Sequence, residues 1–181
     1  MRKFISVGHG GTRDSGATAY GVCEKDLNLQ IAKKLNELLD DSFLSRTSDT
    51  YTTFAEKKRM AAKSDILISI HCNAFANTDV KGIETLHYTF SDNGKKLAKL
   101  VHNELIEATD TLNRGVKPRK DLFVLRETKP PAILVEFGFM TNKNELKLLQ
   151  DEEYQWKLAE AVAEGVDKYE RLAEWLESIC C

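Results

Sequence analysis

The sequence has 181 residues, a formal net charge of −2, 42% hydrophobic residues and 30% charged residues, an ordinary composition for one globular domain. Because basic residues are not in excess, the composition does not favour a nucleic-acid partner. The longest apolar stretches, such as residues 66–70 and 132–135, fall far short of the roughly 20 residues that a membrane span needs.

The first part of the chain alternates between segments typical of strands and segments typical of helices. A glycine-rich loop over residues 8–21 separates the first strand from the first helix, whose apolar residues recur at helical spacing. The expected elements here are a strand at Lys3–Val7, a helix from Glu24 to Leu39, a strand at Phe43–Arg46, a helix at Thr53–Lys63 and a strand at Asp65–His71.

The same alternation continues to the end of the chain. Ser91 is a suitable N-cap for the next helix, and the last helix has apolar residues at intervals of three and four. The expected elements are a strand at Gly82–Tyr88, a helix at Ser91–Ala108, strands at Leu122–Leu125 and Ala132–Glu136, and a helix at Tyr154–Leu176. Alternating strands and helices predict a single α/β domain with a mostly parallel sheet.

The cysteines and the N-terminus bear on the cellular compartment. Cys23, Cys72, Cys180 and Cys181 form no CxxC pair, so we expect free thiols in a reducing compartment and no thiolate zinc site. The apolar segment after Met1 is short and is followed directly by glycines, unlike the core of a signal peptide. We therefore expect a protein made in the cytoplasm.

Four polar residues lie at or beside the expected carboxyl ends of strands, where open parallel sheets bind ligands. They are His9, Glu24, His71 and Glu136. Each of the first three has a plain alternative taken alone: the glycine-rich loop around His9 could bind phosphate, Glu24 could be a simple first-turn glutamate, and His71 could be a hydrogen-bonded core histidine. The loop sequence, however, fits neither GxGxxG nor a Walker motif.

Glu136 is the hardest of the four to explain structurally. It interrupts the apolar run from Ala132 to Met140, where a charge costs several kcal/mol unless it is paired or coordinated. Two histidines and one glutamate are a known ligand set for a catalytic zinc with one open position. A further carboxylate then serves as the general base of metal-assisted hydrolysis.

Eight short segments carry a resemblance to a known family. Each segment contains one of the following residues, in this order along the chain: His9, Glu24, Arg46, His71, Glu84, Arg114, Arg126 and Glu136. With them the sequence resembles the zinc-dependent N-acetylmuramoyl-L-alanine amidases, which include cell-wall amidases and phage endolysins. The resemblance covers about residues 3–169 and implies a six-stranded sheet flanked by helices on both faces.

The resemblance also implies the chemistry. His9, Glu24 and His71 would hold one zinc per chain, and Glu136 would be the catalytic glutamate. The substrate would be peptidoglycan, cut at the amide between N-acetylmuramic acid and the L-alanine of the stem peptide. Arg114, Arg126 and Asn73 would contact stem-peptide carboxylates or amides. The alternatives are a zinc peptidase or amidohydrolase acting on another amide, and an inactive wall-binding module.

Departures from the family pattern shape the remaining expectations. Ser6-Val7 stands where the family often has Asp-Pro, which puts the support of His9 in question. Only eight residues separate Asn73 from Gly82, where some relatives insert a helix that plugs the zinc site. We therefore expect an enzyme that needs no activation.

We further expect a monomeric catalytic domain over residues 1–181, without a separate wall-binding domain. It would reach the wall after release through phage lysis or mother-cell lysis. His102 is interpreted as structural, and His87 is left unassigned.

Overall fold

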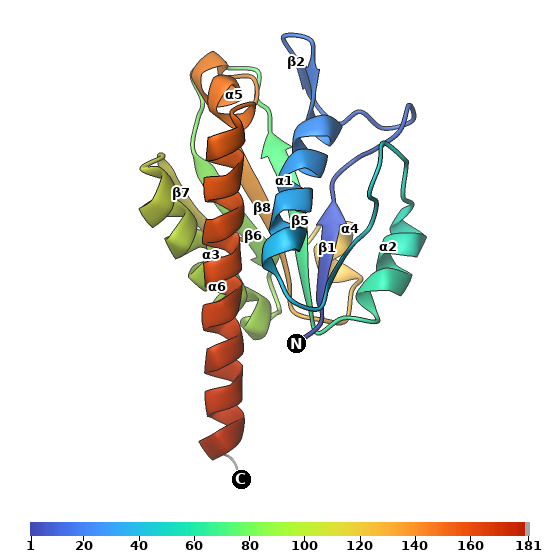
Figure 1. Cartoon of the computed structure of the whole chain (residues 1–181), viewed down its shortest axis with the longest axis vertical. Coiled ribbons are helices and arrows are strands. Elements are labelled where there is room, and N and C mark those ends of the chain that lie inside the picture. Colours follow the sequence, from blue (N-terminus) through green and yellow to red (C-terminus); the bar gives the residue numbers. More distant parts are fainter. Residues whose placement is uncertain (180–181) are drawn as a thin grey trace.

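A six-stranded sheet forms the centre of the computed structural model, which describes residues 1–179 (Figure 1). In spatial order the strands are β4 (Ser42–Leu44), β1 (Lys3–Val7), β5 (Ile66–Asn73), β8 (Ala132–Phe139), β6 (Ile83–Tyr88) and β7 (Asn113–Arg119). The first four are parallel, whereas β6 is antiparallel to β8 and parallel to β7. The predicted strand number and the mostly parallel sheet are confirmed.

Helices cover both faces of the sheet, as predicted. One face carries α1 (Glu24–Leu38), α3 (Asp92–Thr109) and α6 (Glu152–Ile179), and the other carries α2 (Phe54–Ala61) and α4 (Phe123–Arg126) (Figure 1). The short helix α5 (Lys143–Leu149) follows β8, and a small hairpin of β2 (Thr18–Ala19) and β3 (Val22–Cys23) precedes α1.

Close packing fixes the long helix α6 against α3. A Cβ atom at Gly165 would lie 2.5 Å from the Cα atom of Val101, so only glycine permits this approach. The strands β1 and β5 are largely buried on both faces, which explains why most of their residues are apolar. Lys3 is tolerated in β1 because its Nζ lies 2.9 Å from the Glu170 carboxylate.

One predicted strand was wrong. Residues 122–125 were expected to be a strand, but Phe123–Arg126 forms α4, and the sixth strand is β7. The residues of β7 are exposed or only partly buried, so they lack the apolar pattern of a core strand. Pro118 is acceptable there because β7 is the edge of the sheet, where a missing N–H donor is tolerated.

His87 and His102 are buried and are hydrogen-bonded to neighbouring residues of the fold. His102 is buried, with its Nδ1 3.1 Å from Thr85 Oγ1 and its Nε2 2.9 Å from Asn113 Oδ1. His87 is buried, with Nδ1 2.9 Å from the carbonyl of Tyr88. Its side chain lies on the face opposite to Glu84, since successive residues of a strand alternate.

Cys23 and Cys72 are free thiols, whereas Cys180 and Cys181 lie outside the described residues. Within residues 1–179, no helix combines the length and apolar character needed to cross a membrane.

Candidate metal and catalytic site

The first candidate ligand, His9, directly follows β1 in a tightly folded glycine-rich loop. Its backbone is in the left-handed region, with φ of 58°, and the loop closes where the Gly10 N–H donates to the carbonyl of Asp14 at 2.7 Å. The His9 Nδ1 lies 2.8 Å from Asp14 Oδ1, which leaves Nε2 directed toward Glu24. An imidazole held in this way through one nitrogen presents the other to a ligand.

The second candidate, Glu24, is the first residue of α1 and is 5% exposed. Its carboxylate accepts hydrogen bonds from the backbone N–H groups of Ala17 at 3.0 Å and Cys72 at 3.2 Å, and from the Asn28 side chain at 3.1 Å. Burial alone would raise the pKa of Glu24, but its hydrogen bonds with His71 and His9 outweigh burial and hold the pKa far below its usual value. The carboxylate is therefore charged and fixed.

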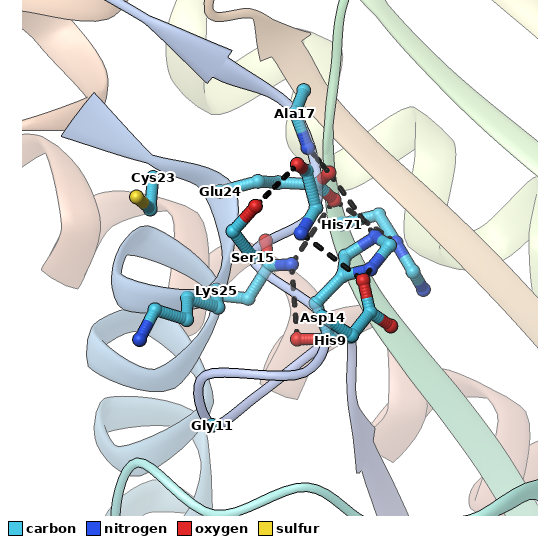
Figure 2. Close-up of polar contacts among 12 residues, drawn as sticks. His9, Gly11, Asp14, Ser15, Ala17, Cys23, Glu24, Lys25 and His71 are labelled. Atoms are coloured by element: carbon cyan, nitrogen blue, oxygen red, sulfur yellow. Dashed lines mark hydrogen bonds and ion pairs between the residues drawn. The ribbon is translucent and has the colours of Figure 1, made fainter. Parts of the chain in front are cut away.

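The third candidate, His71, lies near the end of β5, and its ring faces the same carboxylate. Its Nδ1 is 3.1 Å from Glu24 Oε1, while His9 Nε2 is 3.1 Å from Glu24 Oε2 (Figure 2). The three side chains each offer one ligand atom, and these atoms all lie within 4.8 Å of one another. The structure thus brings together the three residues that the sequence analysis selected as metal ligands.

Two glycines make this convergence sterically possible. A Cβ atom at Gly16 would lie 2.6 Å from both Glu24 Oε2 and His9 Cδ2, and Gly16 has φ of 66°. A Cβ atom at Gly8 would lie 2.6 Å from His71 Cε1. Side chains at either position would occupy the space of the candidate ligands, so the glycine content of this loop follows from the site.

Glu136 lies beside this cluster. It is the register partner of His71 across the parallel pair of β5 and β8, so both side chains lie on the same face of the sheet. Its Oε2 is buried and has no hydrogen-bond partner among the described residues. Burial, followed by the nearby charges of Glu24 and Glu84, raises the pKa of Glu136 well above its ordinary value. An unpaired carboxyl group with a raised pKa is suited to proton transfer.

The three candidate substrate-binding residues have different surroundings. Asn73 and Arg114 meet at Glu84 on β6, where Asn73 Nδ2 donates to Oε1 at 3.4 Å and Arg114 Nε donates to Oε2 at 2.9 Å. Arg126, at the end of α4, instead donates to its neighbour Glu127 at 2.9 Å. The structure therefore places Asn73 and Arg114 in one network, and Arg126 apart from it.

Sequence reasoning missed Lys57, a buried lysine in α2. It lines a small cavity of about 70 Å³ together with Ser6, Ser69, His9 and His71. The Lys57 Nζ donates to the carbonyl of Val7 at 2.8 Å. Burial, with the charge of Arg46 as a second cause, lowers its pKa from 10.5 to about 8. Lys57 is one of several charged residues in its helix, and nothing in the sequence distinguishes a buried ammonium group from an exposed one.

Comparison with known proteins decides the family. A family model described as N-acetylmuramoyl-L-alanine amidase matches residues 4–168. The chain belongs to this family. A solved N-acetylmuramoyl-L-alanine amidase from Clostridium difficile 630 is 38% identical with a TM-score of 0.87, and the match covers 93% of this chain and 95% of that one.

Two curated proteins that resemble this chain are longer than it is. The N-acetylmuramoyl-L-alanine amidase LytC of Bacillus subtilis is 37% identical over 176 residues, which cover 93% of this chain and 35% of LytC. The endolysin of Bacillus phage SPP1 is 36% identical, and the match covers 90% of this chain and 64% of the endolysin. The chain therefore spans less than two thirds of either relative.

Proposed function

We propose that this amidase is a zinc-dependent peptidoglycan hydrolase that cleaves the amide between N-acetylmuramic acid and the L-alanine of the stem peptide. The observation that carries the proposal is the convergence of His9, Glu24 and His71 beside the unpaired carboxyl group of Glu136. Membership of the amidase family supports the choice of bond.

The donor set fits zinc. Two imidazoles and one carboxylate are ligands that catalytic zinc sites use, and three protein ligands leave a position for water or substrate. His9 would bind through Nε2, because its Nδ1 is occupied by Asp14, and His71 would bind through Nδ1, which faces Glu24. Zinc, when bound, polarises the scissile carbonyl and lowers the pKa of a bound water to about 7.

Glu136 would carry the proton in this reaction. Its carboxylate takes a proton from the attacking water and returns it to the alanine nitrogen as the amide bond breaks. Asp14 holds the His9 ring, and the backbone N–H groups of Ala17 and Cys72 hold the Glu24 carboxylate. These contacts fix the ligand geometry before substrate arrives, which lowers the cost of reorganisation during the reaction.

The segment between β5 and β6 supports activity without a trigger. Residues 74–82 contain no helix, and we propose that no element of the chain must leave the site before substrate binds. The proposed place of action is the bacterial cell wall. The cytoplasmic origin, the release by lysis and the monomeric state remain predictions.

Digestion of purified peptidoglycan tests this function. Mass spectrometry should show intact glycan strands and released peptides that begin with L-alanine. Glu136→Gln should keep the fold and one zinc per chain while losing about 10²–10⁴-fold in turnover, the usual contribution of a general acid–base group. Cleavage within the stem peptide would favour the zinc peptidase alternative, and binding of peptidoglycan without any cleavage would favour the inactive wall-binding module.

A further inference from the structure

Glu84 on β6 is a buried carboxylate at the edge of the proposed active site, and two cationic side chains donate hydrogen bonds to it. Its Oε2 accepts hydrogen bonds from Arg114 Nε at 2.9 Å and Lys117 Nζ at 2.6 Å, and its Oε1 accepts from Asn73 Nδ2 at 3.4 Å. Burial raises the pKa of Glu84, but the hydrogen bonds from Lys117 and Arg114 outweigh burial and keep the pKa below its ordinary value. The cluster therefore holds two positive charges and one negative charge.

The position of this cluster is fixed by strand register. Glu84 is the direct partner of Glu136 across the antiparallel pair of β6 and β8, so the two side chains share a face of the sheet. Arg114 and Lys117 come from β7, the next strand. Since neighbouring strands are about 4.8 Å apart, the backbone of β7 runs about 10 Å from that of β8.

Both cations keep donors that Glu84 does not use. Lys117 is 42% exposed, and its ammonium group has three N–H donors, of which Glu84 takes one. Arg114 is 29% exposed, and its Nη1 donates to the carbonyl of Lys81 at 3.3 Å. Its guanidinium group also lies 4.9 Å from the centroid of the Phe139 ring, a contact that restrains it. Either Arg114 or Lys117 alone would balance the charge of Glu84. Together they give the cluster one net positive charge, and both side chains are partly exposed to solvent.

We propose that Arg114 and Lys117, positioned by Glu84, bind the free α-carboxylate of the stem-peptide residue that follows the alanine. The proposal rests on the proposed amidase function and specifies its substrate preference. Where that residue is a γ-linked glutamate, its α-carboxyl group is either free or amidated. This enzyme would prefer stems in which it is free, because a carboxylate accepts charge-assisted hydrogen bonds from both cations.

The span of the substrate agrees with the span of the site. The α-carboxylate is two residues beyond the scissile amide, and an extended chain covers about 7 Å over that length. The side chains of Arg114 and Lys117 reach back from β7 to Glu84, which lies opposite Glu136. A stem peptide that runs from β8 across β6 would thus bring its carboxylate to the two cations.

Two matched substrates test this preference. Both are muramoyl peptides of one sequence, and they differ only in a free carboxylate or an amide at the second residue. For the wild-type zinc enzyme we expect kcat/KM to be at least about tenfold higher for the carboxylate, which corresponds to about 1.4 kcal/mol. The preference should lie mainly in KM, because the cations contact a group remote from the scissile bond.

Variants at Lys117 assign the preference to the cluster. Lys117→Met should bring the ratio of the two kcat/KM values toward one, and Lys117→Arg should largely restore it. Lys117 is half-exposed, so this change does not endanger the fold, and Lys120→Met, which removes an exposed lysine three residues away, should leave the ratio unchanged. Glu84→Gln should also reduce the ratio, because both cations lose the charge that positions them.

The outcomes separate this inference from the proposed function. Equal rates on the two substrates, a preference for the amide, or a ratio unaffected by Lys117→Met would overturn the carboxylate site while amide cleavage continues. Failure of the amidase function would instead appear as no release of alanine-terminated peptide from either substrate.

Discussion

Replacing Lys57 by methionine should stabilise the folded protein at neutral pH. Burial lowers the pKa of Lys57 from 10.5 to about 8, so at pH 7 the fold keeps a poorly solvated ammonium group. Each pH unit of difference is worth about 1.4 kcal/mol, so the cost of this charge is about 3 kcal/mol. The hydrogen bond from Lys57 Nζ to the carbonyl of Val7 stabilises the fold by about 1 kcal/mol, which offsets part of this cost. A methionine side chain fills a volume similar to that of lysine.

We therefore expect Lys57→Met to raise the free energy of unfolding at pH 7 by about 2 kcal/mol, or Tm by about 5 °C. The two pKa values of Lys57 also determine how its effect on stability changes with pH. Because the folded-state pKa lies below the unfolded-state value, the unfolded chain binds more protons between about pH 8 and 10.5. The wild-type protein consequently gains stability from this group as pH rises through that window, and the advantage of the variant shrinks.

Urea unfolding at pH 7 and pH 10 measures this effect, with equal metal content in both proteins. Lys63→Met is the matched control, since Lys63 is exposed just after the same helix and its loss should change stability by less than about 0.5 kcal/mol. Equal stability of Lys57→Met and wild type at pH 7, or an advantage that persists unchanged at pH 10, would refute the reasoning.

Three further predictions concern the metal site. Gly16→Ala should lose zinc on dialysis, because its Cβ atom would lie 2.6 Å from atoms of Glu24 and His9; full zinc retention, measured by atomic absorption, would contradict this. Asp14→Asn should weaken zinc affinity by about 10–100-fold in a competition titration, since Asp14 holds Nδ1 of His9; unchanged affinity would show that this support is dispensable. A chelator should abolish activity on peptidoglycan, and added zinc should restore it without any protease or partner protein; activity that survives complete zinc removal would argue against the metal mechanism.

The parts of the fold that were predictable from sequence are those with a strong burial pattern. The strand at Ile66–Asn73 is an apolar run because helices cover both faces of the sheet there, and α1 repeats its buried leucines at helical spacing. The error at Phe123–Arg126 has the opposite cause. Four apolar and basic residues fit a short strand or one helical turn equally well, and only packing against α2 and the sheet decides.

The edge strand β7 illustrates a second limit. Its residues Asn113–Arg119 are mostly polar and include a glycine and a proline, so no local pattern marks them as a strand. Pairing with β6 creates the strand, and that pairing depends on contacts distant in sequence. The same pairing brings Arg114 and Lys117 to Glu84, which explains why the sequence analysis named Arg114 and Asn73 but not Lys117 or the cluster that they form with Glu84.

The candidate ligands were accessible to sequence reasoning because they lie at or beside the carboxyl ends of expected strands, where open parallel sheets bind ligands. His9 and His71 follow apolar runs, Glu24 stands at a helix start, and the family resemblance pointed to the same three residues. Asp14 was not recognised, since an aspartate in a glycine-rich loop is ordinary, and its role depends on the loop closure that brings it to His9. Position at or beside the ends of expected strands therefore indicated which groups could act, whereas the groups that support them could be found only in the structure.

Glu136 connects the stability of this fold with its proposed chemistry. Its Oε2 is buried without a partner among residues 1–179, and an unsatisfied buried polar group costs about 1–3 kcal/mol. Because the folded-state pKa is raised, the unfolded chain gives up this proton more readily, and Glu136 makes the fold less stable as pH rises above 4.5. Glu136→Gln removes this titratable group and should be at least as stable as wild type at pH 7 while losing turnover. Urea unfolding of the two proteins, each zinc-free, measures the difference. A variant clearly less stable than wild type would show that Glu136 stabilises the fold, and its placement in an apolar strand would then need no catalytic explanation.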